Sequence, residues 1–475
     1  MKFNNIIKIA LALGIFASVS SCSDDRMDVM PTTEEVYEGK LLTAQELEYL
    51  LNNAYGSLNS AAAFGANAII YGELMSDNAF ISTTNDGYYT SLNAMNFNAA
   101  SSDAATTWSQ YYNIIRNANL IIYAEVVEED LGSQLVLEVK AQAHIMKGMA
   151  YLMLAKYFSP SPKLGMDSPY GIVLKHDPWH PVEAKTRSSL QETYDAIIQE
   201  LETGIENLPN FTGEKYYLTK TVANFLLAKT HLYFGNNEQA LIYANKVLNE
   251  SPGDYSLIGN DDYVDYFSAS DNVSFQENQP ETLYEVPQTP VYNLQVNAHP
   301  GVFFASNGQH RSIIYRTAFR DSFDDTDVRK QLFGNNGPNS DTPQGIFIRK
   351  WQRTNSEGPF TQDIKVFRMT EALFIKWEAM AKLGQNPLDE LNAFAQSRGG
   401  STYSGDALTA VLDEKRKEFF GEGTRYYDLK RNGLPIAKGT NCFNCDIAAD
   451  DKLFVFPIPF SEIEKNPDIE QYPGY

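Results

Sequence analysis

The segment from Leu227 to Leu248 constrains the fold most, because its small residues recur at the spacing of two packed helices. Ala228 lies seven residues before Gly235, and Ala240 follows five residues after it. Small side chains let two helices approach closely, and glycine readily adopts the left-handed conformation that ends a helix. Tyr243 follows on the second helix and fills the groove between the two. The sequence therefore predicts a helix–turn–helix unit.

This spacing is typical of a tetratricopeptide-type repeat, and it returns more loosely from Ala379 to Phe394 and more faintly over 151–160. His231 stands where such repeats usually carry an aromatic residue. Because one repeat cannot bury both of its faces, we expect about four stacked helical pairs.

Capping boxes at Thr43–Glu46 and Ser189–Glu192 mark two helix starts. The helical pairs should occupy three segments, at about 41–60, 106–250 and 364–432.

Two further regions, at about 61–104 and 251–363, have no sustained helical period. They are rich in Asn, Asp, Gly, Pro and aromatic residues, with only short alternating stretches such as Gly345–Lys350. We interpret them as irregular, loop-rich regions with little β structure. The sequence then predicts one mainly α-helical domain over 41–475.

The N-terminal residues 1–21 have the layout of a secretory signal peptide, with Lys2 and Lys8 before a short apolar run. Val19–Cys22 resembles the lipobox of bacterial lipoproteins, in which the cysteine is acylated. An ordinary cleavage that leaves a free thiol at Cys22 is the alternative. Residues 22–40 are polar and should form a flexible tether, and Ser23–Asp25 resembles an acidic signal for the outer face of the outer membrane.

The net charge of −22 argues against binding to nucleic acid, since like charges repel. The remaining cysteines, Cys442 and Cys445, are compatible with a redox motif, half of a zinc site, a loop disulfide or two inert thiols. Export to an oxidising compartment favours the last two interpretations.

Motifs for catalysis or metal binding are scarce in this sequence. Pro178 separates His176 from His180 and prevents a helix from aligning the two imidazoles. The acidic run Asp321–Asp327 is a candidate calcium site, although a solvated or arginine-paired turn is favoured. We therefore expect no cofactor. A chain with 60 Asp and Glu residues still contains pairs at glycosidase spacing, so a surface glycoside hydrolase stays an alternative.

Binding of a sugar is better supported than catalysis, because both irregular regions combine aromatic residues with polar ones. Sugars present flat C–H faces ringed by hydroxyl groups, which aromatic rings and amide, carboxylate or guanidinium groups recognise. For each aromatic residue, packing beneath a loop is the competing interpretation. Trp351 is the first candidate, and the full set of candidate ligand-binding residues is Trp351, Tyr88, Tyr89, Asp77, Asn78, Tyr315 and Arg353.

The C-terminal part of the chain carries the most specific motifs. The segment Val411–Arg431, with Glu418, Gly421, Arg425 and Asp428, resembles the helix–turn–helix signature of the SusD/RagB family. The closing motifs of that family resemble Phe456–Pro459 and Gln471–Tyr475, although Tyr472 replaces the more usual asparagine. Trp108–Tyr112, Arg116–Asn119 and Lys140–Ala143 are further matches.

The resemblance implies a SusD-like fold and a role at the cell surface. Members are outer-membrane lipoproteins that capture oligosaccharide and pass it to a SusC-type TonB-dependent transporter, with the helical repeats facing that transporter. It implies binding without catalysis. A peptide-binding member of the family, or a protein-interaction scaffold, is a further alternative. Glu418, Glu422, Arg425 and Asp428 are then expected to form a charged network that stabilises the last repeat.

Overall fold

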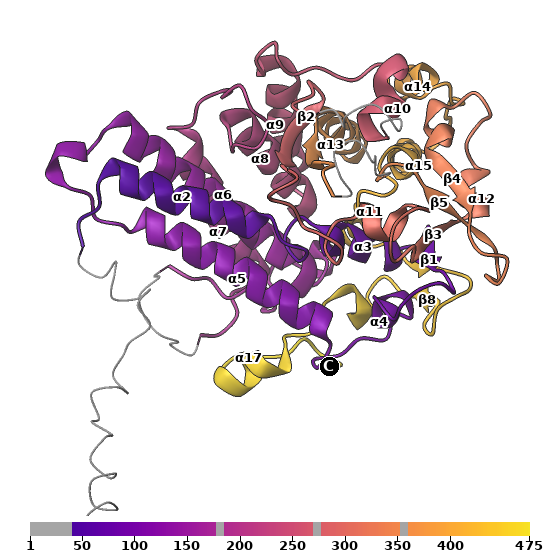
Figure 1. Ribbon diagram of the computed structural model, residues 1–475, viewed down its shortest axis with the longest axis horizontal. Coiled ribbons are helices and arrows are strands. Elements are labelled where there is room, and N and C mark those ends of the chain that lie inside the picture. The colour runs from indigo at the N-terminus through magenta and orange to yellow at the C-terminus, as the bar shows by residue number, and fades with distance from the viewer. Residues whose placement is uncertain (1–39, 177–184, 269–276, 352–359) are drawn as a thin grey trace, which may run out of the picture.

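The computed structural model describes residues 40–176, 185–268, 277–351 and 360–475 (Figure 1). The signal peptide, Cys22 and nearly all of the tether lie outside these residues. Within the described part of the chain, no helix combines the length and the apolar character needed to cross a membrane.

The long helices stack on one another in pairs, as predicted. The helices pack in the order α2, α5, α6, α7, α8, α9, α13 and α15, with α14 against α15. Figure 1 shows α2, α5, α6 and α7 extending to one side and α8, α9 and α13 at the centre. Their bounds are α2 Ala44–Leu58, α5 Ser102–Ile122, α6 Gln134–Phe158, α7 Leu190–Ile205, α8 Lys220–Phe234, α9 Asn237–Glu250, α13 Met369–Lys382, α14 Leu388–Ser397 and α15 Ala407–Glu418.

Local sequence signals account for several helix ends. Thr43 and Ser189 cap α2 and α7 in complete capping boxes with Glu46 and Glu192. Gly235 ends α8 in the left-handed conformation at φ 89°. These positions confirm the helix starts and the turn that the sequence predicts.

The repeat over α8 and α9 shows how its unusual histidine is accommodated. The His231 ring stacks on Tyr243 with centroids 5.3 Å apart, so the imidazole occupies the place of an aromatic residue. Its Nδ1 lies 2.8 Å from the Tyr194 hydroxyl. Burial lowers the pKa of His231 to about 4, which keeps the ring neutral between the helices.

The irregular regions contain short helices and strands and gather at the other side of the molecule in Figure 1. One sheet has the strand order β1-β3-β5-β4, and β2 pairs with β6, all antiparallel. The bounds are α3 Ala66–Leu74, β1 Ala79–Ile81, α4 Thr90–Asn93, α10 Asn260–Phe267, β2 Thr282–Val286, α11 Gly301–Phe304, β3 Ile313–Arg316, α12 Thr317–Arg320, β4 Phe333–Asn336, β5 Gly345–Ile348 and β6 Ile364–Arg368.

Short elements follow α16 in the described C-terminal segment. They are β7 and β8, which form a two-stranded hairpin, and α17. The bounds are α16 Arg425–Asn432, β7 Ile436–Ala437, β8 Asp446–Ile447 and α17 Phe460–Lys465.

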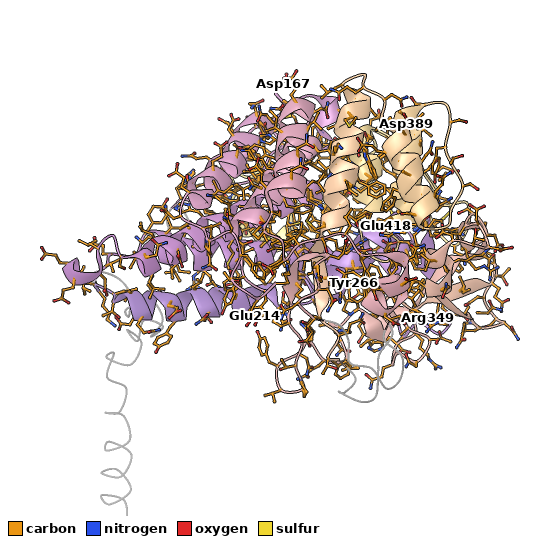
Figure 2. All side chains as sticks on the ribbon, turned by 90° about the horizontal axis from the view of Figure 1, so that it is seen from above. Asp167, Glu214, Tyr266, Arg349, Asp389 and Glu418 are labelled. Atoms are coloured by element: carbon orange, nitrogen blue, oxygen red, sulfur yellow. A yellow bond between two sulfur atoms is a disulfide. The ribbon has the colours of Figure 1, made fainter. Side chains whose placement is uncertain are left out.

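A buried charged network joins the irregular regions to the last repeat, at the end of α15 where Figure 2 labels Glu418. The Glu418 carboxylate lies 3.4 Å from an Arg329 nitrogen and 3.3 Å from an Arg368 nitrogen, and all three side chains are almost completely buried. Arg398 lies 3.5 Å away, and the Tyr263 hydroxyl donates to the same carboxylate at 3.1 Å. Four segments of the chain therefore converge on one carboxylate of α15.

Glu422, Arg425 and Asp428 are also paired, the first two with residues from elsewhere in the chain and Asp428 with residues of the Val411–Arg431 signature itself. Spacing within the motif predicted a charged network without revealing these partners. The pairs are Glu422 with Lys350 and Arg368, Arg425 with Asp77, and Asp428 with Lys415 and Arg431.

Replacing Glu418 tests whether this network holds the fold. We expect Glu418→Gln to lower the free energy of unfolding by about 3–5 kcal/mol, because it removes a buried negative charge that the guanidinium groups of Arg329, Arg368 and Arg398 share. Chemical denaturation measures the difference. Asp325→Asn, which removes an ion pair between Lys330 and an exposed carboxylate, is the matched control and should change stability far less.

The contribution of Glu418 to stability should also depend on pH, in a direction that its pKa determines. Burial opposes ionisation of Glu418, but Arg398, Arg368 and Arg329 lower its pKa from 4.5 to about 2. Its stabilising contribution is therefore complete above about pH 4.5 and is lost as the pH falls towards 2. The stability gap between wild type and Glu418→Gln should narrow over that range; a constant gap would contradict the role of the charge.

Candidate functional site

The two irregular regions meet through the pairing of β1 with β3. Ala79 lies opposite Tyr315 and Ile81 opposite Ile313, although more than 200 residues separate them in the chain. The loop that follows β1 therefore comes beside the loop that precedes β3. Each loop belongs to one of the two regions that were predicted to bind ligand, and the structure brings the two loops to one place.

Tyr88 is the partly exposed aromatic residue at this junction. Its ring centroid lies 4.4 Å from that of His310 and 5.4 Å from that of Phe303. Phe303 is fully buried and also stacks on His310, with centroids 5.0 Å apart, so the three rings contact one another. We call Tyr88, Phe303, His310, Asn297 and Asp86 the Tyr88 cluster. Buried packing beneath Tyr88 fixes its ring and leaves part of it facing solvent.

Polar groups surround this ring at hydrogen-bonding distance. The Asn297 amide oxygen accepts a hydrogen bond from the Tyr88 hydroxyl at 3.1 Å and lies 3.1 Å from His310 Nε2. His310 Nδ1 lies 3.0 Å from the Asp86 carboxylate, whose side chain is 61% exposed. An aromatic face beside an amide and a carboxylate suits a sugar, because the ring covers C–H groups while the polar groups exchange hydrogen bonds with hydroxyls.

Tyr89 lies beneath this surface and supports it. The side chain is 9% exposed, and its hydroxyl donates to Asn67 at 2.8 Å. Its backbone is left-handed at φ 56°, which turns successive tyrosines in different directions. The turn therefore exposes part of the Tyr88 ring and directs Tyr89 into the core.

Asp77 and Asn78 lie between α3 and β1, in polar contacts with the C-terminal helices. Asp77 receives two hydrogen bonds of 3.1 Å from Arg425, and Arg416 lies 3.5 Å away. Burial raises the pKa of Asp77, but Arg425 and then Arg416 outweigh that effect and hold it below the ordinary value. Asn78 is 1% exposed and accepts from Arg416 at 2.6 Å. Both side chains are thus occupied in holding α3 to the last repeat.

Trp351 and Tyr315 lie in the core. Their positions fit packing beneath a loop, which was the alternative to ligand binding for each aromatic residue. Trp351 is 3% exposed and its indole N–H donates to the Gly421 carbonyl at 2.8 Å. Tyr315 is fully buried and donates to the Glu73 carboxylate at 2.8 Å. The sequence indicated aromatic residues beside polar ones, but it did not show that distant parts of the chain would bury the rings.

Arg353 and the lipidation candidate Cys22 lie outside the described residues. The structure adds His310, Asn297 and Asp86 to the site, of which the sequence prediction had selected none as a ligand-binding residue. Asp86 stands in the same polar turn as Tyr88, which is the signal that could have identified it. His310 and Asn297 carry no comparable signal, because their position depends on strand pairing.

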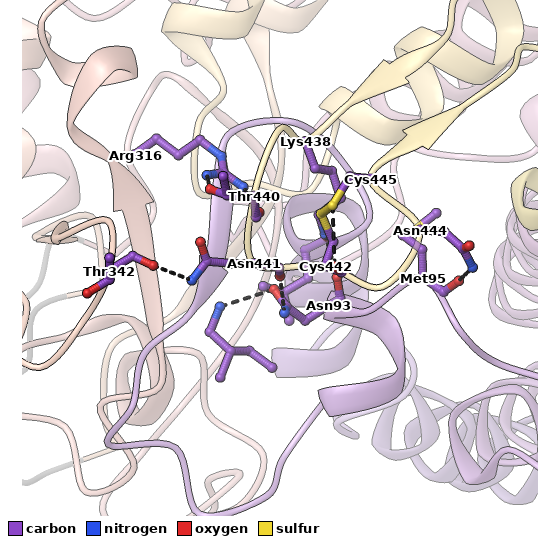
Figure 3. The surroundings of a disulfide bond; sticks show 12 residues. Asn93, Met95, Arg316, Thr342, Lys438, Thr440, Asn441, Cys442, Asn444 and Cys445 are labelled. Atoms are coloured by element: carbon purple, nitrogen blue, oxygen red, sulfur yellow. Dashed lines mark hydrogen bonds between the residues drawn. A yellow bond between two sulfur atoms is a disulfide. The ribbon is translucent and has the colours of Figure 1, made fainter.

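A disulfide-closed loop between β7 and β8 braces the elements beside the Tyr88 cluster (Figure 3). Cys442 and Cys445 form the disulfide, which settles the alternatives that the sequence left open. Asn93 at the end of α4 donates to the Asn441 carbonyl at 2.7 Å, and Arg316 at the end of β3 donates to the Thr440 carbonyl at 2.7 Å. The loop therefore holds in place both α4 and the end of β3, which lie beside the cluster.

The acidic run from Asp321 to Asp327 is bound to protein groups, as the favoured interpretation predicts. Asp327 pairs with Arg329 at 2.7 Å, Asp325 with Lys330 at 2.7 Å, and Asp324 accepts from the Ser401 backbone at 2.6 Å. In the described part of the chain, no three His, Cys, Asp or Glu side chains come together in a way that could hold a metal ion.

Comparison with known proteins relates most of this chain to one group. Residues 25–232 match a family described as starch-binding and associating with the outer membrane, and residues 321–475 match the SusD family. A SusD-like protein of Formosa agariphila is 22% identical over the whole of both chains. The starch-binding protein SusD of Bacteroides thetaiotaomicron is 30% identical over 28% of this chain and 26% of its own.

A solved structure shows the same fold. A SusD superfamily protein from Bacteroides thetaiotaomicron superposes with a TM-score of 0.81 at 22% identity, covering 91% of this chain and 100% of that one. The mainly helical fold predicted from the sequence is confirmed.

Substitution of Trp351 separates a packing role from a binding role. We expect Trp351→Phe to lower the free energy of unfolding by about 1–3 kcal/mol, because the buried Gly421 carbonyl loses its donor. Urea denaturation measures this change. Affinity for any ligand should stay at the wild-type value; a folded variant with weakened binding would show that Trp351 contacts ligand.

Glu73 supplies a second test of the core beneath the site. Burial raises the pKa of Glu73 from 4.5 to about 7, against hydrogen bonds from Tyr315 and Gly423. A raised carboxyl pKa gives stability that is complete below about pH 4.5 and is lost as the pH rises through 7. Relative to Glu73→Gln, the wild type should therefore lose thermal stability between pH 5 and pH 8. A gap that does not change with pH, or that changes in the opposite direction, would contradict this ionisation.

Proposed function

The chain belongs to the SusD/RagB family, and on that basis we propose that it is a cell-surface lipoprotein that binds glycan without cleaving it. It captures oligosaccharide outside the cell and delivers it to a SusC-type TonB-dependent transporter of the outer membrane. Acylated Cys22 anchors it to that membrane, and the helical repeats face the transporter.

The observation that carries this proposal is the Tyr88 cluster. Tyr88 is fixed from below by Phe303 and beside His310, so little conformational freedom is lost when a ligand stacks on it. Asn297 and Asp86 stand beside the ring with exposed polar side chains. This arrangement offers a surface for stacking and hydrogen bonding, which is what recognition of a sugar requires.

The comparisons support the class of ligand. One relative is named a starch-binding protein, and the family matched by residues 25–232 is described as starch-binding and associated with the outer membrane. An acidic protein with a net charge of −22 is also better suited to a neutral polymer than to an anionic one.

The chemistry of the cluster favours binding over hydrolysis. A glycosidase of the usual type needs two carboxyl groups on opposite sides of the scissile bond. Among the described residues of the cluster, Asp86 supplies the one carboxylate, and it is paired with His310. The proposal therefore assigns the cluster no step in which a bond breaks.

Removing the Tyr88 ring tests the proposed function. Residues 23–475 are titrated calorimetrically with maltohexaose, cellohexaose, laminarihexaose, xylohexaose and mannohexaose. We expect at least one to bind, and Tyr88→Ala to weaken that binding by about tenfold or more, because the stacking surface is lost. Tyr123→Ala, which removes a tyrosine that is 45% exposed at the end of α5, is the matched control and should bind normally.

Two results would contradict the proposal. If none of these oligosaccharides binds, or if Tyr88→Ala binds as tightly as Tyr123→Ala, the Tyr88 cluster is not the glycan site. New reducing ends after incubation with a bound oligosaccharide would show that the protein is an enzyme.

A further inference from the structure

A second aromatic surface lies apart from the Tyr88 cluster, in a groove of about 210 Å³ between three segments. One wall is the C-terminal half of α2 with the residue that follows it, and includes Asn52, Gly56 and Asn59. The opposite wall is formed by the pair Tyr216 and Tyr217 before α8 and by the loop that follows β2. Glu214, labelled in Figure 2, marks the position of the segment that carries the two tyrosines.

Five tyrosine residues line the groove. Tyr217 meets Tyr55 edge to face with centroids 5.8 Å apart, and Tyr216 lies 4.7 Å from Tyr217. Tyr284 closes the base and is 2% exposed. Tyr292 stands at the rim and is 52% exposed, so a large aromatic face is open to solvent there.

The rim tyrosine is held by its own turn. The Thr289 backbone N–H donates to the Tyr292 carbonyl at 2.8 Å, and the Tyr292 N–H donates to the Thr289 hydroxyl at 2.9 Å. Gln288 at the base of the turn donates to the Asn59 side chain at 2.8 Å, which links the loop to α2. The groove is therefore preformed and does not depend on closure around a ligand.

The groove is also uncharged. None of the described residues that line it is acidic or basic, although the whole chain carries a net charge of −22. Recognition by ion pairs is therefore not available, while stacking and hydrogen bonding to amide and hydroxyl groups are. That combination suits a neutral, hydroxyl-rich ligand with flat apolar faces.

We propose that this tyrosine groove is a second glycan-binding site, which takes neutral sugar residues. The proposal rests on the proposed function in that it takes the ligand to be a glycan. The groove shares no residue with the Tyr88 cluster, but the loop after β2 reaches both: Tyr292 stands in the groove and Asn297 contacts Tyr88. One preformed loop thus places two aromatic sites on the same protein.

A steric block gives the sharpest test. Gly56 faces the Tyr292 hydroxyl, because a Cβ built on Gly56 would lie 3.5 Å from that oxygen. Gly56→Leu should therefore fill the groove while favouring the α2 helix. Gln45→Leu, at an exposed position nearer the start of α2, is the control for an added leucine.

Fluorine NMR of protein containing 3-fluorotyrosine reports on both sites in one titration. Tyr88→Phe and Tyr292→Phe assign the two signals, and the probes are the five hexasaccharides named above. We expect saturable shifts of the Tyr292 signal that persist in Tyr88→Ala and in Gln45→Leu. In Gly56→Leu they should require at least about tenfold more sugar, because the ring loses its contact with ligand.

The outcomes separate the two proposals. If the Tyr88 signal shifts and the Tyr292 signal does not, the groove is not a glycan site, and the proposed function is unaffected. A shift of Tyr292 alone supports the groove and contradicts the Tyr88 cluster. If neither signal shifts with any of the sugars, both proposals are rejected. A shift of Tyr292 with neutral decapeptides but with none of the sugars overturns the assignment of glycan as the ligand.

Discussion

Burial of one carboxylate, that of Glu418, is the constraint on which the rest of the structure depends. Its charge is compensated by Arg329, in the second irregular region, and by Arg368, at the end of β6. A buried charge without a partner is strongly destabilising, so the repeats and the irregular region can reach this arrangement only together. The network therefore gives a loop-rich region with little regular structure a fixed position against α15.

That fixed position matters because the proposed ligand surfaces are built from loops. Strand pairing between β1 and β3 brings Tyr88 to His310, while the disulfide-closed loop braces α4 and Arg316 beside them. The turn at Thr289 holds Tyr292 over the tyrosine groove. Both surfaces are thus preformed, and binding to them costs little conformational entropy. Rigid loops on a helical scaffold can vary in sequence while the scaffold remains.

The sequence predicted the features that depend on near neighbours along the chain. Helix starts at Thr43 and Ser189 and the turn at Gly235 follow from local chemistry, and all three are found where expected. Features that depend on distant partners were not predictable. The polar neighbours of Trp351 predicted an exposed ring, but the side chain is buried and donates to the carbonyl of Gly421, seventy residues away. His310 could not be predicted as a site residue, because only strand pairing brings it to Tyr88.

The central claim is that two irregular regions, distant in sequence, jointly form a surface that binds glycan intact. A crystal structure of residues 23–475 with a bound oligosaccharide tests it most directly. We predict an uncleaved sugar ring stacked on Tyr88, with its hydroxyls within hydrogen-bonding distance of Asn297 or Asp86. A cleaved sugar, or an oligosaccharide bound without contact to Tyr88, would contradict this claim.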